Sequence, residues 1–265
     1  PGTAGMFDSV AAIYSAPCSA DAWCWQFPTP QGNSMWATWG SGPSDVWGVG
    51  ESGTILHFDG KAWSMVRSPT NSALYGIWGS SPSNIFAVGN RGTVIHWDGT
   101  TWSPLPLGAA GAQVARLFGV WSADGSEVWF VGDHVTAGTA ILQWNGTTAT
   151  RFNVPAGVSK GLRAIWGTGK TSIYAAGESG TLLRWDGNAW GTFGPAMTEP
   201  WSAISGTSDS NFFLASRSGL VYRWNGMTLA NIPVATSPTI NSLWSDGTSI
   251  WAAGDLRYPV TGDPT

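Results

Sequence analysis

Charged residues are scarce in this chain. Only 11% of its 265 residues are Asp, Glu, Lys or Arg, and the lysines are three: Lys61, Lys160 and Lys170. The net charge is -4 and the lysines are scattered, so the basic cluster that neutralises nucleic-acid phosphates is missing. We therefore expect no nucleic-acid partner. So few charges also leave little material for the solvated faces of helices.

Long apolar runs are also missing. No run approaches the roughly 18 apolar residues that cross a bilayer as a helix, and no basic-then-apolar signal opens the chain. The sequence therefore predicts no membrane insertion. Pro1 is interpreted as the start of a mature or trimmed product.

Cysteine is represented only by Cys18 and Cys24, in the segment CSADAWC. A metal site needs more ligands, and Asp21 is the only suitable neighbour, so a small disulfide loop is favoured. Two buried free thiols are the alternative. A disulfide indicates an oxidising compartment, which predicts a secreted or cell-surface protein. We expect no cofactor and no metal, and the sequence gives calcium no support.

Glycine and tryptophan are abundant instead, with 36 and 19 copies, and they recur in phase. The stretch 74–106 shows a complete repeat. An apolar run ends in Trp78-Gly79, a second ends at Gly89, a third closes with Trp97-Asp98-Gly99, and a fourth opens at Trp102. Four short apolar runs in each unit indicate four strands.

The tryptophan of the first run recurs at positions 39, 78, 121, 166 and 244, with Ser205 in the remaining place. A period near 40 residues with four strands is typical of a propeller blade. The sequence therefore predicts one all-β domain, a six-bladed β-propeller with four antiparallel strands per blade. The expected blades are 35–69, 74–106, 114–155, 162–195, 201–233 and an incomplete 240–265.

The sixth unit stops before any third or fourth run. Residues 1–34 hold no complete unit, yet Trp23 to Pro28 resembles the fourth run of a repeat, as in Trp63 to Pro69. We expect this N-terminal segment to pair with the last blade and close the ring. Most phased aromatics are predicted to fill the space between blades, because that space widens outward. The Asp-Gly and Asn-Gly pairs are predicted to be two-residue primed turns.

The second and third runs resemble the tectonin repeat of lectin-like propellers. Val46-Trp47-Gly48-Val49 followed by Gly53-Thr54-Ile55 matches the tectonin pattern, and Ala203 to Gly206 matches its opening. Departures are the Trp-Gly in most first runs and Gly50 in place of the usual Asn. The Trp-Asp pairs also resemble WD-repeat blades, although the Gly-His pair of those blades is absent. The resemblance implies a binding propeller, with glycans as ligands.

The loop between the second and third runs changes in every unit, and we expect all copies to emerge on one face of the ring. Loops on a rigid scaffold are frequent recognition sites. The candidate ligand-binding residues in these loops are Glu51, Arg91, Asp133, His134, Glu178, Arg217, Asp255 and Tyr258.

A second candidate set lies one place before the aromatic of each third run: His57, His96, Gln143, Arg184 and Arg223. These side chains either form repeated sugar sites between blades or cap the solvent side of each blade, and their drifting residue type favours the cap.

Catalysis finds little support. Two of the three histidines, His57 and His96, belong to different blades, and no phosphate loop, nucleophile elbow or metal-ligand spacing occurs. We therefore expect a non-enzymatic recognition module that binds glycans. The alternative is a protein-interaction or adhesin domain of a larger surface protein, and a propeller lyase or hydrolase ranks last.

Overall fold

The computed structural model describes residues 32–233 and 239–255, and these residues form six antiparallel sheets. The first three sheets each have four strands and consist of β1 (Met35–Gly42), β2 (Asp45–Gly50), β3 (Ile55–Phe58) and β4 (Trp63–Met65); β5 (Leu74–Ser81), β6 (Asn84–Gly89), β7 (Val94–Trp97) and β8 (Trp102–Pro104); and β9 (Val114–Ser122), β10 (Val128–His134), β11 (Ala140–Trp144) and β12 (Ala149–Arg151).

Two further sheets have four strands and the last has two. They consist of β13 (Leu162–Gly169), β14 (Ser172–Gly177), β15 (Leu182–Trp185) and β16 (Trp190–Thr192); β17 (Trp201–Ser208), β18 (Asn211–Ser216), β19 (Val221–Trp224) and β20 (Leu229–Ile232); and β21 (Thr239–Ser245) with β22 (Ile250–Asp255). Three short 3-10 turns are η1 (Glu51–Gly53), η2 (Gly108–Gly111) and η3 (Glu178–Gly180).

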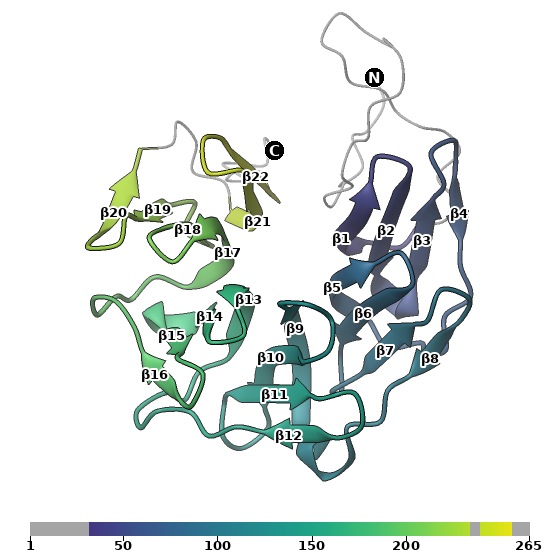
Figure 1. Ribbon diagram of the computed structural model, residues 1–265, viewed down its shortest axis with the longest axis horizontal. Coiled ribbons are helices and arrows are strands. Elements are labelled where there is room, and N and C mark those ends of the chain that lie inside the picture. The colour runs from purple at the N-terminus through teal and green to yellow at the C-terminus, as the bar shows by residue number, and fades with distance from the viewer. Residues whose placement is uncertain (1–31, 234–238, 256–265) are drawn as a thin grey trace, which may run out of the picture.

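The sheets are arranged as blades around a common axis. In Figure 1 the first strand of each blade lies innermost, and later strands lie progressively farther out. Successive first strands contact each other, from β1 to β5, β9, β13, β17 and β21. The expectation of an all-β propeller with four-stranded antiparallel blades is confirmed.

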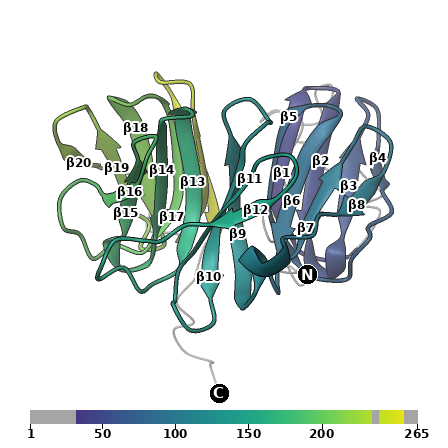
Figure 2. The ribbon, with the colours of Figure 1, turned by 60° about the horizontal axis from the view of Figure 1, so that its bottom comes forward.

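The strands run roughly along the axis of the ring, so their connections gather at two opposite ends (Figure 2). We call one end the turn face and the other the loop face. The turn face holds the connections from first to second strands (43–44, 82–83, 123–127, 170–171, 209–210, 246–249) and from third to fourth (59–62, 98–101, 145–148, 186–189, 225–228). The loop face holds the connections from second to third strands (51–54, 90–93, 135–139, 178–181, 217–220) and from fourth strands to the next blade (66–73, 105–113, 152–161, 193–200).

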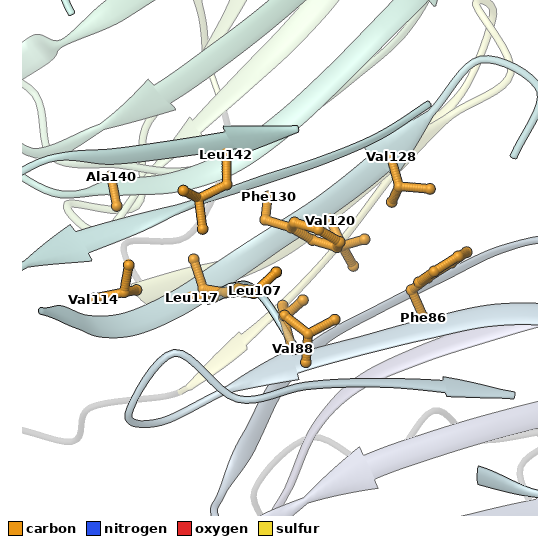
Figure 3. Close-up of a cluster of buried hydrophobic side chains, with 11 residues drawn as sticks. Phe86, Val88, Leu107, Val114, Leu117, Val120, Val128, Phe130, Ala140 and Leu142 are labelled. Atoms are coloured by element: carbon orange, nitrogen blue, oxygen red, sulfur yellow. The ribbon is translucent and has the colours of Figure 1, made fainter. Parts of the chain in front are cut away.

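The hydrophobic core is divided among the spaces between blades. Figure 3 shows one such cluster, in which Phe86 and Val88 of β6 face Val120 of β9 and Phe130 of β10. Equivalent clusters join the other neighbouring blades. The second to fifth blades therefore bury both of their faces, which explains why their strands do not alternate cleanly between apolar and polar residues.

The sixth sheet differs because its described part has only β21 and β22. Trp244 and Trp251 pack on each other with ring centroids 4.9 Å apart, yet they are 58% and 54% exposed. Their counterparts in the first blade, Trp39 and Trp47, pack against the second blade. Of the predicted closing segment 1–34, only residues 32–34 are described. The predicted Cys18–Cys24 disulfide lies outside the described residues. A closed ring of six complete blades therefore stays a prediction.

Removal of residues 1–31 tests this closure. If the segment pairs with β22, its loss exposes a strand edge and apolar surface, and we expect the thermal midpoint to fall by about 10 °C. Thermal unfolding of chain 32–265 beside the full chain measures this. An unchanged midpoint would contradict closure by this segment.

Among the residues that the structure describes, no helix is long and apolar enough to span a membrane.

Candidate functional site

The turn face is built from repeated Asp-Gly and Asn-Gly loops. Asp59 Oδ1 accepts hydrogen bonds from the backbone N–H groups of Lys61 and Ala62, both at 2.9 Å. Asn145 accepts the equivalent pair from Thr147 and Thr148. Only the glycine adopts a positive φ, as in Gly60 at 90°. The prediction of two-residue primed turns was therefore wrong, because the side chain of the first residue caps a four-residue loop.

Acid should weaken these loops where the first residue is Asp. Hydrogen bonds from the backbone of Thr101, and from the hydroxyl and N–H of Thr100, lower the pKa of Asp98 below its usual value of 3.8. A lowered folded-state pKa stabilises the fold above the unfolded-state pKa, and that contribution disappears as the pH falls. We expect the free energy of unfolding to drop from about pH 5 toward pH 2.

Asp98→Asn provides the matched variant, since Asn145 and Asn225 already make the same hydrogen bonds. We expect this variant to lose less stability than the wild type between pH 5 and pH 2 in urea titrations at each pH. Identical pH slopes would contradict this assignment.

The third-strand polar residues all bond within the turn-face half of the molecule. Each one contacts the residue at, or just before, the start of the second strand of its own blade. The pairs and donor–acceptor distances are His57 with Asp45 at 2.7 Å, His96 with Asn84 at 2.7 Å, Gln143 with Glu127 at 3.3 Å, Arg184 with Ser172 at 3.4 Å and Arg223 with Asn211 at 3.0 Å.

Most of these side chains also cover the aromatic residue of the second strand. His57 stacks on Trp47 with ring centroids 4.1 Å apart, and His96 stacks on Phe86 at 4.4 Å. Burial lowers the pKa of His96. The guanidinium carbons of Arg184 and Arg223 lie 5.8 and 5.7 Å from the ring centres of Tyr174 and Phe213, so four of the five cover an aromatic ring of their own blade.

Asp45 gathers a Ser, a His and a Trp, a combination that invites comparison with a catalytic triad. It accepts hydrogen bonds from Ser41, His57 and Trp47, and these outweigh partial burial to lower the pKa of Asp45 below 3.8. Catalysis would need the serine to bond the histidine. Here Ser41 bonds the carboxylate directly, so the group joins β1, β2 and β3 together.

The loop-face residues form pairs that link neighbouring elements. Glu178 Oε1 lies 2.9 Å from Arg163 Nη2 and 2.9 Å from Arg217 Nη1, which belongs to the next blade. Asp133 pairs with Arg116 across β9 and β10. Glu178 and Asp133 are therefore held by arginines rather than brought together as an acid and a base.

The other loop candidates have separate positions. His134 is buried, and its Nδ1 accepts hydrogen bonds from the backbone N–H of Thr136 and Ala137, so it caps its own loop. Arg91 is exposed on a backbone with φ 57°, next to the second-strand end. Glu51 begins η1. The side chain of Asp255 and all of Tyr258 lie outside the described part of the chain.

A further set, absent from the sequence predictions, arises from a β-bulge in every first strand. In each blade one residue near the loop face is skipped in the register with the second strand. In β5, for example, Leu74 pairs with Gly89 and Gly76 pairs with Val88, so Tyr75 has no partner. The six bulge residues are Trp36, Tyr75, Phe118, Arg163, Ser202 and Asn241. A bulge redirects its side chain out of the regular pleat.

A glycine at or near the end of most second strands makes this bulge sterically feasible. A Cβ on Gly89 would collide with the backbone carbonyl oxygen of Ala73, and one on Gly177 with that of Gly161. Gly50, Gly132 and Gly254 lie against the first strand in the same way. The repeated glycine therefore allows the two backbones to approach closely at the bulge.

Four consecutive bulge residues form a continuous contact from blade to blade, which we call the inner arc: Trp36, Tyr75, Phe118 and Arg163. Trp36 meets Tyr75 edge to face with centroids 6.1 Å apart, and Tyr75 stacks on Phe118 at 5.3 Å. The Arg163 guanidinium lies 4.0 Å from the centre of the Phe118 ring. Because all four residues belong to first strands, which lie innermost in each blade, the arc follows the inner edge of the ring (Figure 1).

Charge is divided between the two faces. Among the side chains that the structure describes, the loop-face half carries seven basic and four acidic ones: Arg67, Arg91, Arg116, Arg151, Lys160, Arg163 and Arg217 beside Glu51, Asp133, Glu178 and Glu199. The turn-face half carries four basic and eight acidic ones: Lys61, Lys170, Arg184 and Arg223 beside Asp45, Asp59, Asp98, Asp124, Glu127, Asp186, Asp209 and Asp246. The described part of the loop face is thus basic on a protein that is acidic overall.

Within 32–233 and 239–255 no three His, Cys, Asp or Glu side chains gather as a metal site. One apolar pocket near the outer edge of the fourth and fifth blades is lined by Gly194, Pro195, Trp224, Met227, Thr228 and Leu229, with no titratable side chain.

Comparison with known proteins identifies the fold of the chain but no family to which it belongs. No family model and no curated protein matches the chain. Solved structures do match, and those of the RRP9 WD40 repeats and of U3-55K each show 12% identity and a TM-score of 0.66. Both alignments cover 86% of this chain, with 74% and 75% of the other chain. The chain has a WD-repeat-like propeller fold.

A third structure, described as YCF48 bound to a D1 peptide, is 17% identical with a TM-score of 0.57. The alignment covers 71% of this chain, and this chain spans only 62% of that one. These neighbours support the resemblance to WD-repeat blades. They give no support to the tectonin family or to carbohydrate binding.

Proposed function

We propose that this propeller is a non-enzymatic protein-interaction module that binds a peptide segment of its partner on the loop face. The observation that carries the proposal is the inner arc together with the loop-face arginines beside it, which present aromatic and guanidinium groups from adjacent blades on one face. Trp, Tyr and Arg are the residues most enriched at the energetic centres of protein interfaces. Five packed blades supply the rigid support that such a site needs.

The expected glycan site gains no support from the contacts of its candidate residues. His57, His96, Gln143, Arg184 and Arg223 each bond a residue of their own blade, and Arg184 also pairs with Asp209 of the next blade, which supports a structural role for them. The alternative reading, a protein-interaction domain, is therefore the proposal. A propeller neighbour whose structure is described as bound to a peptide agrees with this mode of use. A secreted or surface location stays a prediction that depends on the Cys18–Cys24 disulfide.

Selection from a random dodecapeptide display library tests the proposal. We expect the immobilised chain to enrich peptides that bind it in solution. Arg217→Glu, on the loop face, should abolish this binding, whereas Lys61→Glu makes a similar change of charge on the turn face and should not. Thermal unfolding of both variants verifies their folds. Failure to enrich any peptide, or equal loss of binding in both variants, would contradict the proposal.

A further inference from the structure

We infer that the segment bound by the loop face is acidic and inserts an aromatic or aliphatic side chain against the inner arc. This inference rests on the proposed function and specifies the chemistry of the partner. Two independent observations carry it: the exposed aromatic surface along the bulge residues, and the division of charge between the two faces.

The aromatic observation defines the apolar contact. Trp36 is 45% exposed, and Tyr75 and Phe118 are half-buried, so ring surface remains available beside each blade-to-blade contact. Their positions are fixed, because each ring stacks on a neighbour and each backbone is held by the bulge. A pre-organised aromatic surface binds an apolar side chain with little loss of conformational entropy.

The division of charge indicates that the bound segment carries carboxylates rather than amines. Glu178 and Asp133 occupy some donors of Arg163, Arg217 and Arg116. The Arg217 and Arg116 side chains nevertheless remain 48% and 46% exposed, and a guanidinium has five N–H donors. Arg91 adds an exposed charge on the same face. An acidic segment is therefore attracted to the loop face and repelled by the turn face, which fixes the side on which it docks.

The dodecapeptides enriched by the display selection provide the test. We expect them to contain at least two Asp or Glu residues close to a Phe, Trp, Tyr or Leu. In fluorescence anisotropy, a synthetic twin with Asn and Gln in place of the acids should bind about tenfold more weakly, as should a twin with Ser in place of the apolar residue. Higher salt should weaken the acidic peptide more than its amide twin.

Substitutions in the protein test where the peptide makes contact. Arg91→Glu should weaken the acidic peptide about tenfold and its amide twin much less. Tyr75→Ala should weaken binding of both the acidic peptide and its amide twin. It should leave binding of the twin with Ser in place of the apolar residue almost unchanged. Lys61→Glu serves as the control on the turn face. Enrichment of neutral or basic peptides would overturn the inference while leaving a peptide-binding propeller standing, and enrichment of nothing would remove both proposals.

Discussion

Trp129→Ala should lower the free energy of unfolding by about 4 kcal/mol, the largest effect expected of a single substitution here. Trp129 in β10 is 2% exposed and fills the space between the third and fourth blades. Its ring centroid lies 4.9 Å from that of Phe152, 5.1 Å from Trp185 and 5.5 Å from Trp190. Truncation would leave a cavity walled by three large rings that cannot collapse into it.

Urea unfolding measures this loss, and Met227→Ala is the control. Met227 is also apolar, but it is 85% exposed in the loop between β19 and β20, so its truncation should stay within about 0.5 kcal/mol. A loss below about 1 kcal/mol for Trp129→Ala would contradict the assignment of the phased tryptophans to the core between blades.

Gly89→Ala should destabilise the chain by about 3 kcal/mol and also weaken peptide binding. The added methyl would collide with the carbonyl oxygen of Ala73 and with the Leu74 backbone. Because the obstacle is backbone, relief requires β5 and β6 to separate, and this displaces Tyr75 at the bulge. Stability and inner-arc binding therefore change together at this position.

Gly191→Ala is the matched control for this substitution. Gly191 lies within β16, and a methyl group there would meet nothing within 4 Å. We expect a change within about 0.5 kcal/mol, since the strand is on the outer edge and a side chain is tolerated. Equal effects of the two substitutions in urea unfolding would show that loss of glycine itself, and not the close approach at the bulge, determines the cost.

The phase of the repeat made most of the blade structure predictable. Trp78, Gly89, Trp97 and Trp102 mark strands one to four because each repeats at a fixed place in the unit, and the observed strands follow these marks. The turn type was less predictable. Asp98 and Gly99 suit a primed turn by composition, but the hydrogen bonds that Asp98 Oδ1 accepts from the N–H groups of Thr100 and Thr101 favour a longer loop.

The inner arc could not be predicted in the same way. The bulge position is aromatic only in the first three blades and is then occupied by Arg163, Ser202 and Asn241, so no residue type repeats there through all six units. Only the glycine at the end of the second strand repeats, and its meaning depends on a carbonyl oxygen that lies nearby in space. The pairing of Glu178 with Arg217, 39 residues away, likewise needs the blades to be placed side by side.

The central claim is that the inner arc on the loop face receives the partner. The most direct test is two-dimensional NMR of the indole and guanidinium N–H groups during titration with an enriched acidic dodecapeptide. The account predicts shifts at Trp36 Nε1 and Arg163 Nε, with Trp97 Nε1 and Arg223 Nε on the turn-face half unchanged. Shifts confined to Trp97 and Arg223, with Trp36 and Arg163 unmoved, would contradict it.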